Sequence, residues 1–317
     1  MIILFLLAMA CDKPPQARRE VFLHFFAVPD VRATNPPEDD IDDVNIFIFG
    51  PGNSPEAHIW ARGREIQNNS VKASLIKDVP YTFYICANTG YKMPDASASE
   101  LDEMRYFLTY PDEFSRGIPM SAVLRDVVAD DDIDLELKRC MAKLEIRLDR
   151  SKLYSGVDIG VESIEVGGCP RSVALFKESR ARSTSDLFPK GYHRSGMETG
   201  PLNTDVADGM SAPLTLYLLE NCQGTLLDGA TGPEDKVFGS LEKTGELCSY
   251  VEIHASYSSS RYCNRPGEYL IYRFYLGESL DNFDVRRNVN YSIVVRPEGS
   301  GLNETSWRVD RSALQAV

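Results

Sequence analysis

Few residues of the kinds that build catalytic or metal centres occur in this sequence. Its 317 residues include four histidines and two tryptophans, and no GxSxG, HExxH, GxGxxG or GxxxxGK[ST] motif is present. The cysteines show no CxxC or Cys/His spacing of the kind that holds zinc. We therefore predict that the chain is not an enzyme and has no catalytic residue, metal ligand or cofactor.

The scarce histidines and tryptophans are also dispersed along the chain. His24 and His254 lie in strand-like segments, where we expect outward-facing or hydrogen-bonded packing residues rather than metal ligands. Trp60 and Trp307 have the ring type that stacks on sugars. Isolated tryptophans in strand segments are more often core residues, so this pattern alone predicts no binding site.

Positive charge is the minority charge in this chain. The 47 acidic residues outnumber the 34 lysines and arginines, and the formal net charge is -13. Electrostatic repulsion therefore argues against nucleic acid or an anionic membrane surface as a partner. The hydrophobic content of 43% is typical of a folded protein, and the length suffices for two domains.

The N-terminal apolar run is too short to span a membrane. Residues 2–7 (IILFLL) make up about half of the roughly 20 residues that a spanning helix needs, and Ala8, Met9, Ala10 and Cys11 follow. This pattern resembles a lipoprotein signal peptide at residues 1–10, with Cys11 as the lipidated residue and residues 11–19 as a tether. No Lys or Arg precedes the run, so the true start could lie upstream. The alternative is a plain secretory signal with a chance cysteine.

Six further cysteines leave the disulfide state open, since six thiols allow fifteen pairings. Cys86 and Cys140 lie within apolar runs, where a cysteine is usually a small buried hydrophobe. We expect mostly free, structural cysteines.

Strand-like segments rich in aromatic and β-branched residues recur every 10–15 residues with short turns between them. Such spacing predicts an all-β protein built from antiparallel sandwiches. Residues 20–28 form the first strong strand signal, and residues 268–277 and 291–295 form late ones. A short helix is expected within residues 97–107, where apolar residues have helical spacing.

A change of domain is expected near residue 135, which gives an N-terminal sandwich at residues 20–134 and a C-terminal one at residues 135–317. Residues 135–148 read as one continuous strand, and residues 177–210 as a long irregular excursion. The acidic run at residues 130–134 fails the EF-hand pattern, because Leu135 stands where its glycine should be.

Six segments in order resemble the Bacteroidetes fimbrillins, the subunits of type V pili. They are residues 117–121 (GIPMS), 139–144 (RCMAKL), 220–225 (ENCQGT), 272–277 (YRFYLG), 283–291 (FDVRRNVNY) and 306–310 (SWRVD). The resemblance implies two tandem transthyretin-like (Greek-key) domains. It also implies export as an outer-membrane lipoprotein, a membrane contact through the lipid, and a final place in a fimbrium at the cell surface.

The same resemblance implies assembly with other fimbrial subunits by strand exchange. An arginine-specific protease removes the first strand, and a strand from a neighbouring subunit fills the groove. In this chain the removable strand is residues 20–28 and the candidate cleavage site is Arg32. Arg18 and Arg19 precede that strand.

The candidate donor segment is the C-terminal end, with Trp307, Val309 and Leu314. Only seven residues follow Asp310, and they extend to at most about 25 Å. A stalk subunit, a tip subunit and an accessory lipoprotein therefore remain open. A glycan- or ligand-binding surface lipoprotein that does not polymerise is the alternative from a different functional class.

Overall fold

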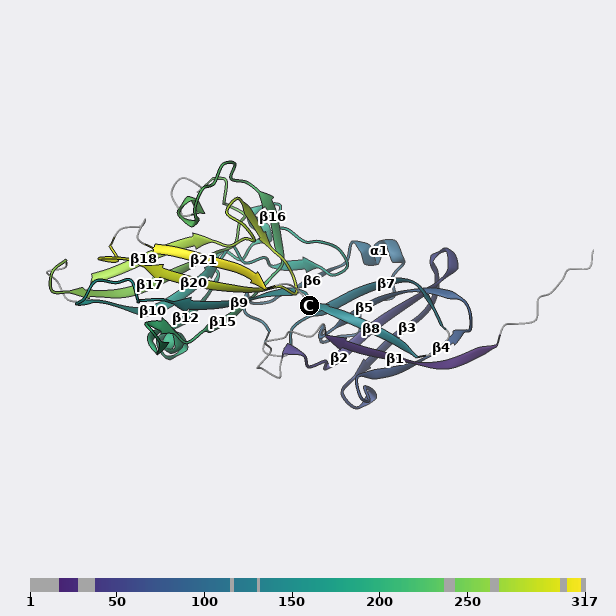
Figure 1. Cartoon of the computed structure of the whole chain (residues 1–317). Helices are drawn as coiled ribbons and strands as arrows, with labels where there is room; N and C mark the ends of the chain where they lie inside the picture. The colour runs from purple at the N-terminus through teal and green to yellow at the C-terminus, as the bar shows by residue number, and fades with distance from the viewer. Residues whose placement is uncertain are drawn as a thin grey trace, which may run out of the picture.

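Strands make up most of the computed structural model, which describes residues 17–27, 38–114, 117–129, 132–236, 243–262, 268–302 and 307–314. They form two lobes that lie end to end (Figure 1). The prediction of an all-β sandwich protein is confirmed at this level. No helix in the described ranges is long and apolar enough to cross a membrane.

The first lobe is a sheet of seven strands in the order β3-β2-β5-β7-β8-β1-β4. Their bounds are β1 Arg18–Ala27, β2 Asp43–Gly50, β3 Ser54–Arg62, β4 Ser70–Ile76, β5 Pro80–Ala87, β7 Met120–Val128 and β8 Ile133–Arg139. β7 and β8 pair only through Met120↔Arg139 and Ser121↔Lys138. The strands on either side of this short ladder therefore face one another as two layers, and a shared apolar core fills the space between them.

The second lobe is a sandwich of two four-stranded sheets, β15-β9-β20-β21 and β12-β10-β17-β18. Their bounds are β9 Met141–Leu148, β10 Val157–Gly167, β12 Tyr192–Ser195, β15 Leu214–Leu219, β17 Tyr250–Ser259, β18 Glu268–Tyr275, β20 Asn290–Pro297 and β21 Trp307–Leu314. Both sheets contribute to one core, which includes Leu144 and Ile146 of β9 and Ile253 of β17. Alternation of apolar and polar residues in these segments is what lets each sheet bury one face.

Small elements complete both lobes and the junction between them. They are β6 Arg105–Phe107, β11 Ser172–Ala174, β13 Asp205–Ala207, β14 Met210–Ser211, β16 Asn221–Thr225, β19 Asn282–Val285, and the 3₁₀ helices η2 Pro51–Asn53, η3 Gly63–Glu65, η4 Thr184–Asp186, η5 Gly196–Asn203 and η6 Pro233–Lys236. β6 of the first half pairs with β11 of the second, so the two halves share a ribbon as well as a core.

The expected short helix is confirmed as α1, Ala98–Asp102, and its N-terminus is closed by a capping box. Ser97 accepts a hydrogen bond from the amide of Glu100, and the Glu100 carboxylate accepts one from the amide of Ser97 at 2.8 Å. This capping box satisfies amides that the helix leaves free. Leu101 of this helix is buried.

Two predictions about individual segments are wrong. Residues 135–148 are two strands, β8 and β9, which belong to different sheets on either side of Cys140. The predicted boundary after residue 134 thus lies inside β8. Residues 177–210 are not simply irregular, since β12 within them pairs with β10. Apolar residues keep alternating through residues 135–148, so the pattern hid the break between the two strands. β12 has only four residues, which is too short for alternation to reveal a strand within residues 177–210.

None of the five cysteines in the described part of the chain forms a disulfide, and all five are buried. They are Cys86, Cys140, Cys169, Cys222 and Cys248. Burial raises the pKa of the Cys169 and Cys248 thiols to about 12, since an apolar surrounding disfavours the thiolate. The expectation of structural thiols is confirmed for these five; Cys263 lies outside the described residues.

Candidate assembly site

The first strand of the chain lies between two other strands. β1 pairs antiparallel with β4, from Arg18↔Ile76 to His24↔Ser70, and parallel with β8, from Leu23↔Ile133 to Ala27↔Leu137. The structure places Arg18 and Arg19 inside β1, which corrects the prediction that they precede the strand. Because β1 lies between β4 and β8, its removal would open a groove with an unpaired strand on each side.

The core-facing residues of β1 fill this place with apolar side chains. Val21 and Leu23 have no exposed surface and Phe25 is 1% exposed, whereas the intervening Phe22 is 41% exposed. Full burial of one such side chain contributes about 1.5–3 kcal/mol. The strand is thus held chiefly by three alternate side chains and by its backbone ladders.

The outer face of β1 makes weaker contacts. Asp132 accepts a hydrogen bond from the amide of Phe22 at 2.9 Å and lies 3.7 Å from His24. Lys72 is 3.1 Å from Glu20, and both side chains are mostly exposed. Exposed ion pairs add little stability because water screens them. His24 is therefore an outward-facing residue, as its position in the strand predicted.

The chain is anchored again at Glu38, a short distance beyond β1. The Glu38 side chain is buried, and one of its carboxylate oxygens lies 3.2 Å from the Lys143 ammonium and accepts a hydrogen bond from the Tyr217 hydroxyl. Arg139 also donates to the Glu38 carbonyl at 3.0 Å. Buried charges persist when they are paired and hydrogen-bonded. Glu38 thereby fastens the entry to the first lobe onto the second lobe.

A second group of polar contacts fixes the junction from the side of the second lobe. Arg287 donates to the carbonyls of Ala174 and Leu175 at 2.6 and 2.9 Å, and its guanidinium pairs with Glu220 at 2.6 Å. The Ser121 hydroxyl of the first lobe donates to the same Leu175 carbonyl at 2.5 Å. No sequence motif marked Glu38. Arg287 and Glu220 lie in two of the segments that resemble fimbrillins, but the sequence did not show that they pair, because they are more than 60 residues apart along the chain.

The predicted donor segment forms β21 at the edge of the second lobe. β21 pairs antiparallel with β20 over eight residues, from Trp307↔Pro297 through Val309↔Val295 to Leu314↔Asn290. It has a strand on one side only in the described sheet order. Figure 1 shows it as the outer yellow arrow, which runs toward the first lobe. The other predicted residues, Cys11 and Arg32, lie outside the described residues.

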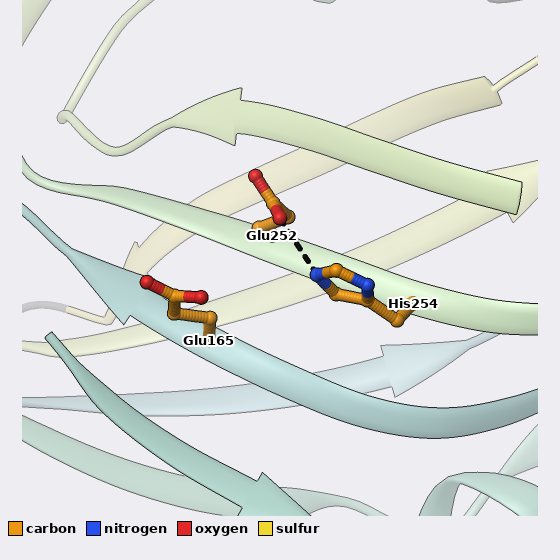
Figure 2. Close-up of side chains that lie close together, drawn as sticks. All are labelled: Glu165, Glu252 and His254. Atoms are coloured by element: carbon orange, nitrogen blue, oxygen red, sulfur yellow. Dashed lines mark hydrogen bonds and ion pairs between the residues drawn. The ribbon is translucent and has the colours of Figure 1, made fainter. Parts of the chain in front are cut away.

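One cluster in the described ranges has a geometry that could suit a metal ion. Glu165 of β10 lies beside Glu252 and His254 of β17 (Figure 2). Their ligand atoms all lie within 4.8 Å of one another. The His254 ring nitrogen lies 2.6 Å from one Glu252 oxygen, and Arg273 contacts the other. Both Glu252 oxygens are thus engaged by cationic or hydrogen-bonding side chains. We interpret the cluster as an ion-pair network on the sheet face.

Part of the second lobe matches a known protein family. Residues 216–295 match the family model described as a domain of unknown function (DUF4906). None of the curated proteins matches the chain.

Solved structures match over nearly the whole chain. A candidate cell adhesion protein from Bacteroides eggerthii is 13% identical, with a TM-score of 0.61 over 95% of this chain and 97% of that chain. The tip fimbrial protein Mfa3 from Porphyromonas gingivalis, with a C-terminal truncation, is 12% identical, with a TM-score of 0.57 over 95% of this chain and 100% of that chain. A fimbrilin from the same species is 12% identical, with a TM-score of 0.53 over 94% and 97%. The structural neighbours of this chain are therefore Bacteroidetes fimbrial and candidate cell adhesion proteins, whose fold it shares.

Proposed function

We propose that the chain is a structural and adhesive subunit of a type V fimbrium, assembled by exchange of β1 for a strand of a neighbouring subunit. In this role the protein catalyses no reaction. The observation that carries it is the place of β1. The strand has a neighbour on each side, it buries alternate side chains, and it can be separated from β2 by one backbone cut. The shared fold with fimbrial proteins supports the same conclusion.

Arg32 is the proposed cleavage site, since it lies between β1 and the anchored residue Glu38. A cut there by an arginine-specific protease would free β1 while Glu38 kept the rest of the lobe attached at the junction. The open groove would expose the apolar positions now covered by Val21, Leu23 and Phe25. A strand that repeats their alternation would regain both backbone ladders and buried surface.

We further propose that the precursor is exported as an outer-membrane lipoprotein through Cys11. The two lobes are proposed as tandem transthyretin-like domains. We propose their junction at Cys140 rather than after residue 134, and the pairing of β8 with β1 supports this choice. β21, with Trp307, Val309 and Leu314, is the proposed donor, since it would have to leave only one neighbouring strand.

Limited digestion tests this function. Purified protein treated with an arginine-specific protease should lose an N-terminal fragment and form a ladder of oligomers in gels run without boiling. Arg32→Ala should stay intact and monomeric, whereas Arg19→Ala, at the alternative arginine, should form the ladder as before. A ladder of equal strength from Arg32→Ala would exclude Arg32 as the site. Complete removal of β1 without any ladder would contradict strand exchange.

A further inference from the structure

A cavity of about 690 Å³ lies where β2 begins, β3 ends and the chain leaves β5. Its wall includes three aromatic side chains from separate parts of the chain: Trp60 of β3, Tyr91 from the loop after β5, and Tyr106 of β6. Arg62 and Arg64 also line it. This volume is in the range of small-ligand sites in proteins.

Strand register brings the aromatic residues together. Trp60 is the cross-strand partner of Asn45. The Asn45 side-chain amide donates to the Tyr91 carbonyl at 3.1 Å, which ties the Tyr91 loop to the same part of the sheet. Tyr106 is held by its pairing with Val173 of β11. Tyr91 itself is 49% exposed, so its ring is available to a ligand.

Buried polar groups hold the floor of the cavity in one conformation. The Asp43 carboxylate accepts hydrogen bonds from the amides of Gly90 at 2.8 Å and Thr89 at 3.1 Å. The Asn88 side chain donates to the Ile118 carbonyl at 2.9 Å. Gly117 has φ of +105°, and a Cβ there would lie 2.8 Å from the Asn88 amide nitrogen. A loop constrained this closely presents Tyr91 without a large ordering cost on binding.

The wall of the cavity combines flat aromatic rings with side chains that can donate hydrogen bonds to a ligand. Aromatic rings pack against the C–H faces of sugar rings, and guanidinium groups donate to hydroxyl or carboxylate oxygens. Burial raises the pKa of the Tyr106 hydroxyl to about 12, so that it stays protonated and able to donate. Within the described residues, no carboxylate forms an ion pair with the guanidinium group of Arg62 or Arg64.

We infer that this cavity binds a pyranose unit of a glycan, with the ring against Trp60 and Tyr91 and its hydroxyl or carboxyl groups toward Arg62 and Arg64. A purely apolar ligand would offer no acceptor to the guanidinium groups of Arg62 and Arg64. A polyanion would be repelled by the net charge of -13. The inference rests on the adhesive half of the proposed function and supplies its ligand class. It is tested on uncleaved monomer, so that failure of binding and failure of assembly are distinguishable.

Saturation-transfer NMR of the full chain with methyl glycosides provides the test. The probes are the methyl glycosides of glucose, galactose, mannose, N-acetylglucosamine and glucuronic acid, at millimolar concentration. At least one should receive saturation, and Tyr91→Ala should weaken its affinity at least tenfold. Tyr269→Ala, which removes a 67% exposed tyrosine from β18 in the other lobe, is the matched control and should bind as the unaltered protein does.

Arg64→Met separates the two classes of sugar. Loss of glucuronide binding with neutral glycosides unaffected assigns Arg64 to a carboxylate, whereas weakened binding of a neutral glycoside assigns it to a hydroxyl; both support the site. Trp60→Phe keeps an aromatic ring and guards against misfolding as the cause of lost binding. Absence of saturation on all five glycosides, or unchanged affinity in Tyr91→Ala and Trp60→Ala together, would overturn the inference.

Discussion

The first strand of each lobe occupies the same position in its sheet. β1 lies between β4 and β8, and β9 lies between β15 and β20. In both lobes the pairing with the later strand is parallel, β1 with β8 and β9 with β20, and the pairing on the other side is antiparallel. Both strands bury alternate apolar side chains, as Leu23 and Leu144 illustrate.

The two strands differ in how the chain enters and leaves them. β9 follows β8 after the single residue Cys140, so its removal would need a cut at each end. β1 is followed by a connection of fifteen residues before β2, and everything before β1 would leave with it. Sheet geometry is therefore common to both lobes, and connectivity alone makes one groove able to open.

The largest expected effect concerns exchange itself. A fluorescent peptide with the sequence of residues 17–27 should enter protein cleaved between β1 and β2, and it should not enter intact protein. Size-exclusion chromatography with fluorescence detection measures incorporation. A peptide with Leu23→Asp is the control, because a buried unpaired charge prevents docking. A peptide of residues 141–148 should not enter either protein. Its incorporation would show that the β9 groove opens as well.

The next largest effect concerns the buried contacts of Glu38, which would hold the cleaved first lobe to the second lobe. Lys143→Met should lower the free energy of unfolding by about 3 kcal/mol, since it leaves the buried Glu38 carboxylate without that ammonium. Chemical denaturation measures the loss. Lys143→Met combined with Glu38→Gln should recover part of it. If the double variant is as unstable as the sum of the single ones, the pair is not coupled.

Core truncation should then distinguish β1 from β9. Leu23→Ala and Leu144→Ala each remove a fully buried side chain and should each cost about 3 kcal/mol in intact protein. After cleavage between β1 and β2, only Leu23→Ala should also speed the loss of the N-terminal fragment. Denaturation curves and fragment release on gels provide the measurements. Val128→Ala, at a 46% exposed position, should stay within about 0.5 kcal/mol of the parent.

The smallest effect tests whether surface charge helps to hold β1. Lys72→Ala removes the exposed pair with Glu20 and should change stability by no more than about 0.5 kcal/mol. The rate of fragment release from cleaved protein should be unchanged within error. A release rate several times faster would mean that the outer face of β1 carries more of its attachment than the buried face does.

Local patterns were enough to predict many of the elements. Segments rich in aromatic and β-branched residues located β1, β18 and β20, and the Ser97–Glu100 capping pair lies where the short helix was expected. The same rule failed at residues 135–148, because alternation continues across Cys140 while the chain passes from one sheet to the other. Nor could it show that β1 and β8 are parallel neighbours, since they are about a hundred residues apart in sequence.

The sequence by itself determined the all-β class, several of the strands and the fimbrial resemblance, because these depend on residue type at short spacing. The tertiary structure alone decided which strands become neighbours. It placed β1 between β4 and β8, joined Glu38 to Lys143, and brought Trp60, Tyr91 and Tyr106 to one cavity. Long-range pairing depends on how whole sheets bury their faces together, and no local pattern contains that information.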